Sequence, residues 1–192
     1  DFLQTSENIV VEYVNVDAFG NVDVLHLEKL LKASKVKTLV SLMMINNEIG
    51  NLLLVHEIAN VCKLNNALFH SDTVQVIGHY KIDLQATMID FMVASAHKFH
   101  GPKGVGFAFF RKGFGIVPML HGGGQEKGAR SSTENVHAIL GMEKALEIAH
   151  NTLEEDKIHI ENLKFYFITE LKKISKDFQF NGHSGNLEKS SY

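Results

Sequence analysis

The sequence predicts an α/β fold with a three-layer architecture around a mostly parallel sheet. Short apolar runs at 38–45, 67–69 and 91–94 are bounded by polar or turn-forming residues, which is typical of buried strands, here expected at 38–45, 67–71 and 91–96. Such strands belong mostly to parallel sheets that are covered on both faces. A fourth run, at 104–110, follows the third after only a short loop. Because a parallel neighbour needs a long crossover, we expect the fourth strand to be antiparallel to the third.

The first elements are a strand, a turn and two helices. Residues 9–16 are rich in β-branched side chains and predict a strand, which a Gly20-Asn21 turn follows. Asp23 is placed to cap a helix over 24–33. A second helix, at 55–64, has apolar residues spaced for one buried face, and Cys62 is among them. We therefore expect Cys62 to be a packed core thiol.

The last third of the chain reads as a loop followed by helices. A glycine-containing loop at 122–133 precedes predicted helices at 134–149 and 152–174. The second helix carries an apolar stripe that we expect to be buried, formed by Ile160, Leu163, Phe167, Leu171 and Ile174. Residues 178–180 are a candidate strand, and 181–186 read as a loop. The remainder, through Tyr192, is uninformative and a candidate for disorder.

The composition is that of a soluble globular protein. The 192 residues are 45% hydrophobic and 21% charged, and a net charge of −3 gives no indication of a nucleic-acid-binding surface. No stretch approaches the roughly 18 apolar residues of a membrane span, and no secretory signal pattern is present. A single cysteine excludes an internal disulfide and agrees with a reducing compartment. We therefore expect a cytoplasmic location, without nucleic-acid or membrane partners.

Polar side chains follow three predicted strands at the point where each one ends. The residues concerned are Asn47, Asp72, Gln75, Ser95, His97 and Lys98. The carboxyl ends of parallel strands are where open α/β sheets bind ligands. A lysine buried there would have a lowered pKa and become a usable nucleophile. The segment that carries Lys98, taken alone, fits equally well with a junction between a strand and a surface loop that carries two basic residues without a function. Three such strand ends together favour one shared crevice.

Four ordered motifs extend this observation. They are Asn-Asn-Glu-Ile-Gly at 46–50, Asp-Thr-Val-Gln at 72–75, Ser-Ala-His-Lys-Phe-His-Gly-Pro-Lys-Gly at 95–104 and Gly-Gly-Gly-Gln-Glu at 122–126. In this order and spacing the chain, over about 11–149, resembles the pyridoxal-phosphate-dependent cysteine desulfurases, which are relatives of the class-V aminotransferases. Selenocysteine lyases share the pattern. The resemblance is therefore more specific for the cofactor than for the substrate.

The resemblance implies a role for four of these residues around the cofactor ring. Lys98 matches the lysine that forms a Schiff base with the aldehyde of pyridoxal phosphate and then moves protons. Asp72 matches the carboxylate that keeps the pyridine nitrogen protonated, with a helix cap as the alternative. Gln75 and Asn47 match amides near the phenolic oxygen. A loop amide that bonds its own backbone is an open alternative for both, most of all for Asn47.

Three further residues match ligands of the cofactor phosphate. Ser95 and His97 fit because a hydroxyl and an imidazole can both donate to phosphate oxygens. Thr133 resembles a threonine that reaches the phosphate of the neighbouring subunit, which implies a homodimer with shared sites. The family usually has glycine where Ser132 stands, and serine tolerates a positive φ less well. The sequence predicts no metal site, because no cysteine or carboxylate lies at ligand spacing from His97.

The resemblance also implies how the chain is organised into domains. Residues 1–133 match the C-terminal part of the cofactor-binding large domain of a fold-type-I transferase, which is partial here. Residues 134–192 match the linking helices and the start of a small α+β domain. The family's upstream glycine-threonine phosphate loop, its stacking histidine and its downstream sulfur-accepting cysteine loop have no counterpart. We therefore expect a part of a longer enzyme, and no activity for the isolated 192 residues.

The activity that the resemblance implies is removal of sulfur from the substrate cysteine. Alanine is left, and the sulfur passes to an enzyme cysteine as a persulfide, for iron–sulfur cluster assembly or thiolation pathways. A sulfur-acceptor scaffold protein is the implied partner. Two alternatives stay open at this point. One is a selenocysteine lyase or another class-V enzyme, and the other is a truncated chain that folds or dimerises without turnover.

Overall fold

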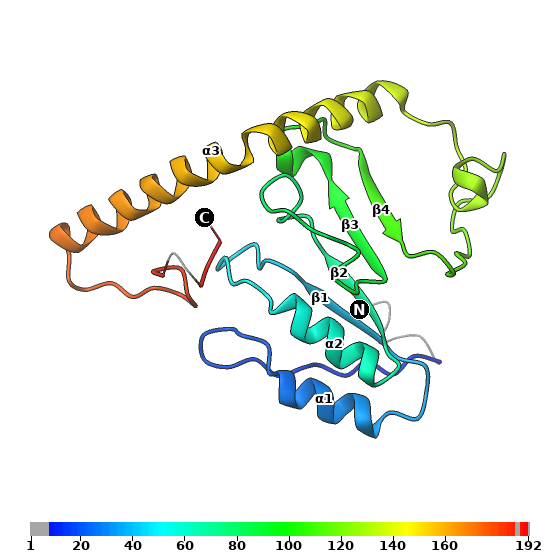
Figure 1. Ribbon diagram of the computed structural model, residues 1–192, viewed down its shortest axis with the longest axis horizontal. Helices are drawn as coiled ribbons and strands as arrows, with labels where there is room; N and C mark the ends of the chain where they lie inside the picture. The colour runs from blue at the N-terminus through cyan, green and yellow to red at the C-terminus, as the bar shows by residue number, and fades with distance from the viewer. Residues whose placement is uncertain (1–7, 187–188, 192) are drawn as a thin grey trace.

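A four-stranded sheet lies at the centre of the computed structural model, which describes residues 8–186 and 189–191. Its order is β1-β2-β3-β4 (Figure 1), with bounds β1 (Leu39–Met43), β2 (Leu68–Asp72), β3 (Phe91–Ser95) and β4 (Gly106–Phe110). The first three strands are parallel, and β4 pairs antiparallel with β3. The predicted α/β class, the mostly parallel sheet and the antiparallel fourth strand are confirmed.

Helices α1 (Val24–Ala33) and α2 (Val55–Leu64) have the predicted bounds. Asp23 caps α1, because its carboxylate accepts a hydrogen bond from the backbone N–H of His26 at 2.9 Å. The apolar side of α2 packs into the main core cluster, in which Cys62 is 1% exposed. Burial, and secondly the charge of Asp90, raises the pKa of the Cys62 thiol to about 11. The prediction of a packed core thiol is confirmed.

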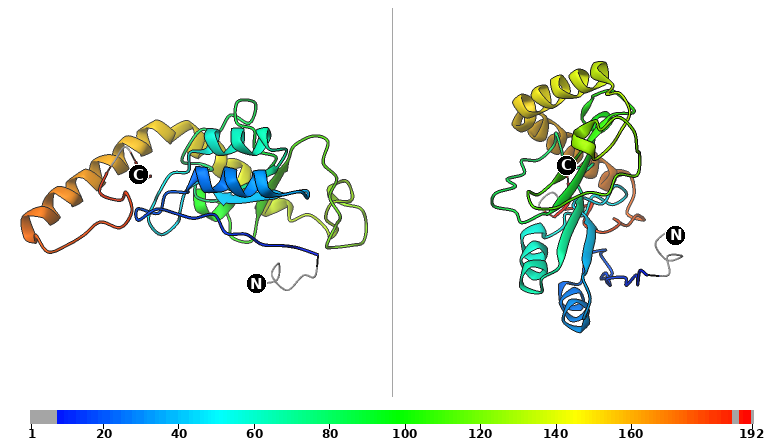
Figure 2. Two further views of the ribbon diagram at one scale, coloured as in Figure 1. Left: turned by 90° about the horizontal axis from the view of Figure 1, so that it is seen from below. Right: turned by 90° about the vertical axis from the view of Figure 1, so that its right-hand side faces the viewer.

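The sheet has one well-buried face and one more open face. Alternate residues of β2 and β3 are buried on the side of α2, namely Phe69, Ser71, Met92 and Ala94. Figure 2 shows α2 lying along one face of the sheet. The strand register puts the intervening residues on the opposite face, where Ser41 pairs with His70 and His70 with Phe91. Ser41 is exposed, so we refer to this side as the open face.

The connection from β2 to β3, residues 73–90, consists of turns instead of a helix. Arg111, directly after β4, hydrogen-bonds carbonyls of this connection. Its Nη2 donates to the oxygens of Leu84 and Thr87, both at 3.0 Å, and Nη2 and Nε both donate to the oxygen of Ile89, at 2.7 and 3.0 Å. One guanidinium group thereby supplies hydrogen-bond donors to backbone carbonyl groups. In a crossover helix, such carbonyl groups would accept hydrogen bonds from the N–H groups of the helix itself.

The two predicted helices at 134–149 and 152–174 are a single helix, α3 (Val136–Ile174). Neither glycine nor proline interrupts the sequence between them, so nothing ends the first helix. The second half of α3 projects beyond the sheet (Figures 1 and 2). The expected burial of its apolar stripe is therefore wrong for Leu163, Phe167 and Ile174, which are 54%, 63% and 82% exposed. The spacing of the apolar residues therefore predicted correctly that the segment is helical, but not that most of these side chains are exposed.

Two predicted strands are absent from the described residues. Residues 9–16 form no strand, and only Val16 makes an isolated bridge, with Val22. An extended segment needs a partner along its whole length to form a ladder. Residues 178–180 are likewise not a strand. The rings of Phe178 and Phe180 instead pack edge-on, with their centroids 5.2 Å apart.

The chain end is ordered where the structure describes it. Ser190 pairs with Asn51, and the Ser191 N–H donates to the oxygen of Gly50 at 2.8 Å. The expected disorder is therefore wrong for 189–191, and residues 187, 188 and 192 lie outside the described part. The loop expected at 181–186 is confirmed as a series of turns.

Candidate functional site

The carboxyl ends of the parallel strands meet at one edge of the sheet. Met43 pairs with Asp72, and Asp72 pairs with Val93. Ser95 lies two residues beyond Val93, so Asp72 and Ser95 are on the same face, which is the open one. Asn47 follows the end of β1 at the same edge. Strand pairing therefore places Asp72 and Ser95 at one edge of the sheet, and Asn47 lies in the loop that follows β1.

Asp72 is the half-buried last residue of β2. Its Oδ1 accepts a hydrogen bond from the Val74 N–H at 2.9 Å, and the chain continues as turns, so this carboxylate closes a turn and caps no helix. Its Oδ2 has no hydrogen-bond partner within the described residues. That oxygen remains available to an N–H group of a ligand.

The imidazole of His70 lies close enough to Asp72 for the two to interact electrostatically. His70 lies two residues earlier on the same face, and its Nδ1 is 2.8 Å from the hydroxyl of Ser41. Burial lowers the pKa of His70, and the negative charge of Asp72 only opposes this effect. Burial therefore favours the neutral form of His70 beside the charge of Asp72.

Lys98 lies on a single 3-10 turn, η1 (Ala96–Phe99), directly after β3. The turn is anchored by buried Ala96 and Phe99, and the Gly101 N–H donates to the oxygen of Ala96 at 2.8 Å. The Lys98 side chain is exposed, so the burial expected from the sequence is wrong. The backbone of Lys98 is fixed by a further contact: Nε2 of His79 is 2.9 Å from its carbonyl oxygen.

The two predicted phosphate ligands contact each other. The hydroxyl of Ser95 is 2.8 Å from Nδ1 of His97. Ser95 ends β3 and His97 belongs to the η1 turn, so both precede Lys98 by three residues or fewer. A hydroxyl, an imidazole and an amine are therefore presented from one short segment.

The remaining predicted residues are less closely joined to this group. Nδ2 of Asn47 donates to Oε1 of Glu48 at 2.6 Å, and both residues are exposed. Gln75 is half-buried in the turn that follows Asp72. Thr133 is exposed at the end of the loop that precedes α3, and within the described residues it makes no hydrogen bond to the other site residues.

Sequence reasoning missed two residues that organise the site. Thr73 is fully buried, and its hydroxyl and N–H both donate to the oxygen of Val93, at 2.7 and 3.2 Å. This links the end of β2 to β3. His79 binds the backbone of Lys98. Thr73 directly follows Asp72 in the motif at 72–75, whereas nothing in the local sequence pointed to His79.

Ser132, next to Thr133, has a φ of 101°, a conformation that favours glycine. We expect Ser132→Gly to raise the free energy of unfolding by about 0.5–1 kcal/mol, because it removes this backbone strain. Ser132→Ala is the matched control, since it changes the side chain and keeps the strain. Urea unfolding followed by circular dichroism measures both. Equal midpoints for the glycine and alanine variants would contradict the expectation.

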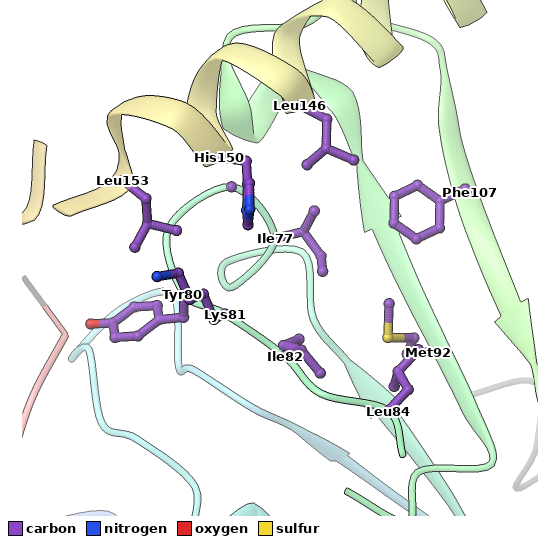
Figure 3. Close-up of a pocket in the computed structure, with 11 residues that line it drawn as sticks. Ile77, Tyr80, Lys81, Ile82, Leu84, Met92, Phe107, Leu146, His150 and Leu153 are labelled. Atoms are coloured by element: carbon purple, nitrogen blue, oxygen red, sulfur yellow. The ribbon is translucent and has the colours of Figure 1, made fainter. Parts of the chain in front are cut away.

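Two cavities lie apart from these residues. One, of about 190 Å³, lies between α3 and the sheet (Figure 3), and its apolar lining includes Ile77, Met92, Phe107 and Leu146. The other, of about 600 Å³, lies near the end of β1, and its lining includes Asn46, Asn51 and His183. Neither is lined by Asp72 or Lys98.

Among the described residues there is neither a metal-binding cluster nor a membrane-spanning helix. No group of three or more histidine, cysteine, aspartate or glutamate side chains is arranged to hold a metal ion there. Over the same part of the chain, no helix has the length and apolar character needed to cross a membrane.

The chain is similar to known proteins over almost its whole length. The profile of the aminotransferase class-V family matches residues 1–192. Cysteine desulfurase IscS of Dictyoglomus turgidum is 40% identical over 176 residues, which are 92% of this chain and 44% of that protein. Cysteine desulfurase IscS of Methanosarcina thermophila is 42% identical over 173 residues, which are 90% of this chain and 42% of that protein.

Solved structures show the same similarity. The X-ray structure of a NifS-like protein from Rickettsia africae superposes with a TM-score of 0.88 at 37% identity. The superposition covers 97% of this chain and 51% of that one. The chain therefore spans about half the length of the relatives that it matches.

Proposed function

Because this chain belongs to the class-V aminotransferase family, we propose that it carries the cofactor-binding lysine segment of a pyridoxal-phosphate-dependent cysteine desulfurase. The observation that supports this most directly is the shared edge of the sheet. The Asp72 carboxylate and the segment with Ser95, His97 and Lys98 lie there on neighbouring parallel strands. The names of the relatives, cysteine desulfurases of two organisms, support the substrate class.

The residues present fit pyridoxal phosphate by their chemistry. When bound, this cofactor supplies an aldehyde and an electron-withdrawing ring. The amine of Lys98 is solvent-accessible on an ordered turn, and Oδ2 of Asp72 lacks a partner within the described residues. The Ser95–His97 pair offers donors for a phosphate. We propose that these four residues hold the cofactor, with Gln75 and Asn47 near its phenolic oxygen.

Each residue then has a defined task in the reaction. Oδ2 of Asp72 accepts the N–H of the ring nitrogen and keeps that nitrogen protonated. With the cofactor bound, the amine of Lys98 would take and return the proton at the substrate α-carbon. Ser95 and His97 hold the phosphate and fix the cofactor in place. Thr133, on its exposed loop, reaches the phosphate of the neighbouring subunit in a homodimer.

The proposed overall reaction converts cysteine and an enzyme thiol into alanine and an enzyme persulfide. The sulfur then passes to an acceptor scaffold protein, for iron–sulfur cluster assembly or thiolation in the cytoplasm. Cys62, the single cysteine of the 192 residues, is buried in the core and does not serve as that thiol. We therefore expect the 192 residues alone to produce no persulfide. Residues 1–133 are proposed as large domain, and 134–192 as the link into a small domain.

The test of this proposal is where the cofactor attaches. The purified chain is mixed with pyridoxal phosphate, reduced with borohydride and digested, and the modified peptides are mapped by mass. We expect the adduct on Lys98 in at least about tenfold excess over Lys103, an exposed lysine in the same segment. A Lys103→Ala variant, the control, should keep the Lys98 adduct. An adduct spread evenly over the surface lysines would reject the proposal.

A further inference from the structure

His79 touches the segment that carries Lys98 at its backbone. Its Nε2 is 2.9 Å from the Lys98 carbonyl oxygen. A single 3-10 turn leaves its last carbonyl groups without internal partners. His79 supplies a donor to one of them, at the residue on which the proposed chemistry depends. The bond requires a proton on Nε2, which one neutral tautomer and the imidazolium both carry.

Gly78 makes this contact possible. Its φ is +87°, and a Cβ there would lie 3.1 Å from Cγ of Phe99, 3.5 Å from Cβ of Ala149 and closer still to Cβ of Phe99. A side chain at this position would therefore push the loop away from the η1 turn. Phe99 is almost fully buried, so it cannot move aside easily. Gly78 and His79 together hold the loop against Lys98 and Phe99.

The contact joins the two halves of the candidate site. His79 lies at the end of the turns that begin after Asp72, and its N–H donates to the oxygen of Val76 at 2.9 Å. The same turns contain Gln75. The His79–Lys98 bond thus ties the segment with the carboxylate to the segment with the amine. The two segments are 19 residues apart in sequence at this contact.

We propose that His79 is the positioning residue for Lys98. By holding the Lys98 carbonyl, His79 fixes the orientation of the Cα–Cβ bond and so restricts the region that the exposed amine can reach. This proposal rests on the proposed function, because it assigns Lys98 as the cofactor lysine. It adds a residue that does not itself touch the cofactor.

The first test compares two substitutions at this position. His79→Leu removes the donor, whereas His79→Gln keeps an N–H near the position of Nε2. After treatment with pyridoxal phosphate and borohydride, we expect the ratio of Lys98 to Lys103 adduct to fall on the order of 3- to 10-fold in His79→Leu. His79→Gln should restore the ratio to within about twofold of wild type. His159→Leu, at an exposed histidine of α3, is the control and should change nothing.

The second test needs no cofactor and separates this proposal from the proposed function. Hydrogen–deuterium exchange of the peptide that contains Gly101 reports the order of the η1 turn, because the Gly101 N–H is bonded to Ala96. We expect faster exchange in His79→Leu and near wild-type exchange in His79→Gln. Unchanged exchange and an unchanged adduct ratio in His79→Leu would overturn the positioning role. A wild-type chain without a Lys98 adduct would reject the function instead, while the exchange result would still decide whether His79 holds the turn.

Discussion

Arg111→Ala is expected to lower the free energy of unfolding by about 3 kcal/mol, the largest effect on stability of the changes considered. The guanidinium group donates to the carbonyls of Leu84, Thr87 and Ile89. It also lies 3.9 Å from a carboxylate oxygen of Asp90. Truncation to alanine removes all of these charge-assisted hydrogen bonds at once. The carbonyl groups then lose their donor, and no helix in the connection supplies another.

Thermal and urea unfolding followed by circular dichroism measure this effect. For a chain of 192 residues, a loss of that size corresponds to a fall of about 6–12 °C in the thermal midpoint. Lys112→Ala is the matched control, because Lys112 is the exposed neighbour of Arg111 and its loss should change the stability by less than about 0.5 kcal/mol.

An Arg111→Lys variant separates charge from geometry. One ammonium group keeps the positive charge beside Asp90 but lacks the forked arrangement of Nε and Nη2. We expect Arg111→Lys to lie between wild type and Arg111→Ala. A midpoint for Arg111→Ala equal to that of Lys112→Ala would show that the crossover does not depend on this side chain.

The Cys62 thiol is expected to react with iodoacetamide at least about 100-fold more slowly in the folded chain than in the unfolded chain at pH 8. The thiolate is the reactive form, and burial raises the pKa of Cys62 from 9.0 to about 11. A shift of that size lowers the thiolate fraction at pH 8 by about 100-fold, and the packing of the core slows the reaction further.

Mass spectrometry measures this directly, because Cys62 is the single cysteine of the sequence. The same chain in concentrated urea is the reference. Alkylation of the folded chain within tenfold of that reference would mean that the core around α2 opens readily. The thiol also affects stability at high pH. Since its pKa is higher in the folded chain, its contribution to stability is complete below about pH 9 and is lost as the pH rises toward 11.

Local signals in the sequence were sufficient for the elements near the sheet. The Asp23 cap and the apolar spacing of α2 gave both helices their correct bounds. Short apolar runs located all four strands, and loop length alone gave the antiparallel orientation of β4. Because parallel strands end at one edge, the order of the motifs also indicated that Asp72 and Ser95 lie close together.

Other features depend on contacts between distant parts of the chain. Residues 9–16 have the composition of a strand but find no partner for a ladder in the described structure, and the apolar stripe of α3 lies largely on a segment that projects from the sheet. Lys98 looked like a buried lysine because a strand precedes it, yet the η1 turn leaves its side chain exposed.

The sequence by itself determined the bounds of α1 and α2 and the positions of the four strands of the sheet, and it indicated the edge of the sheet that carries the chemical groups. Periodicity, capping and turn residues act over a few neighbours, so they are readable along the chain. Only the tertiary structure decided that Arg111 supports the crossover and that His79 holds Lys98. These contacts join residues 19 to 27 positions apart, and no local pattern encodes which side chain meets which carbonyl at that separation.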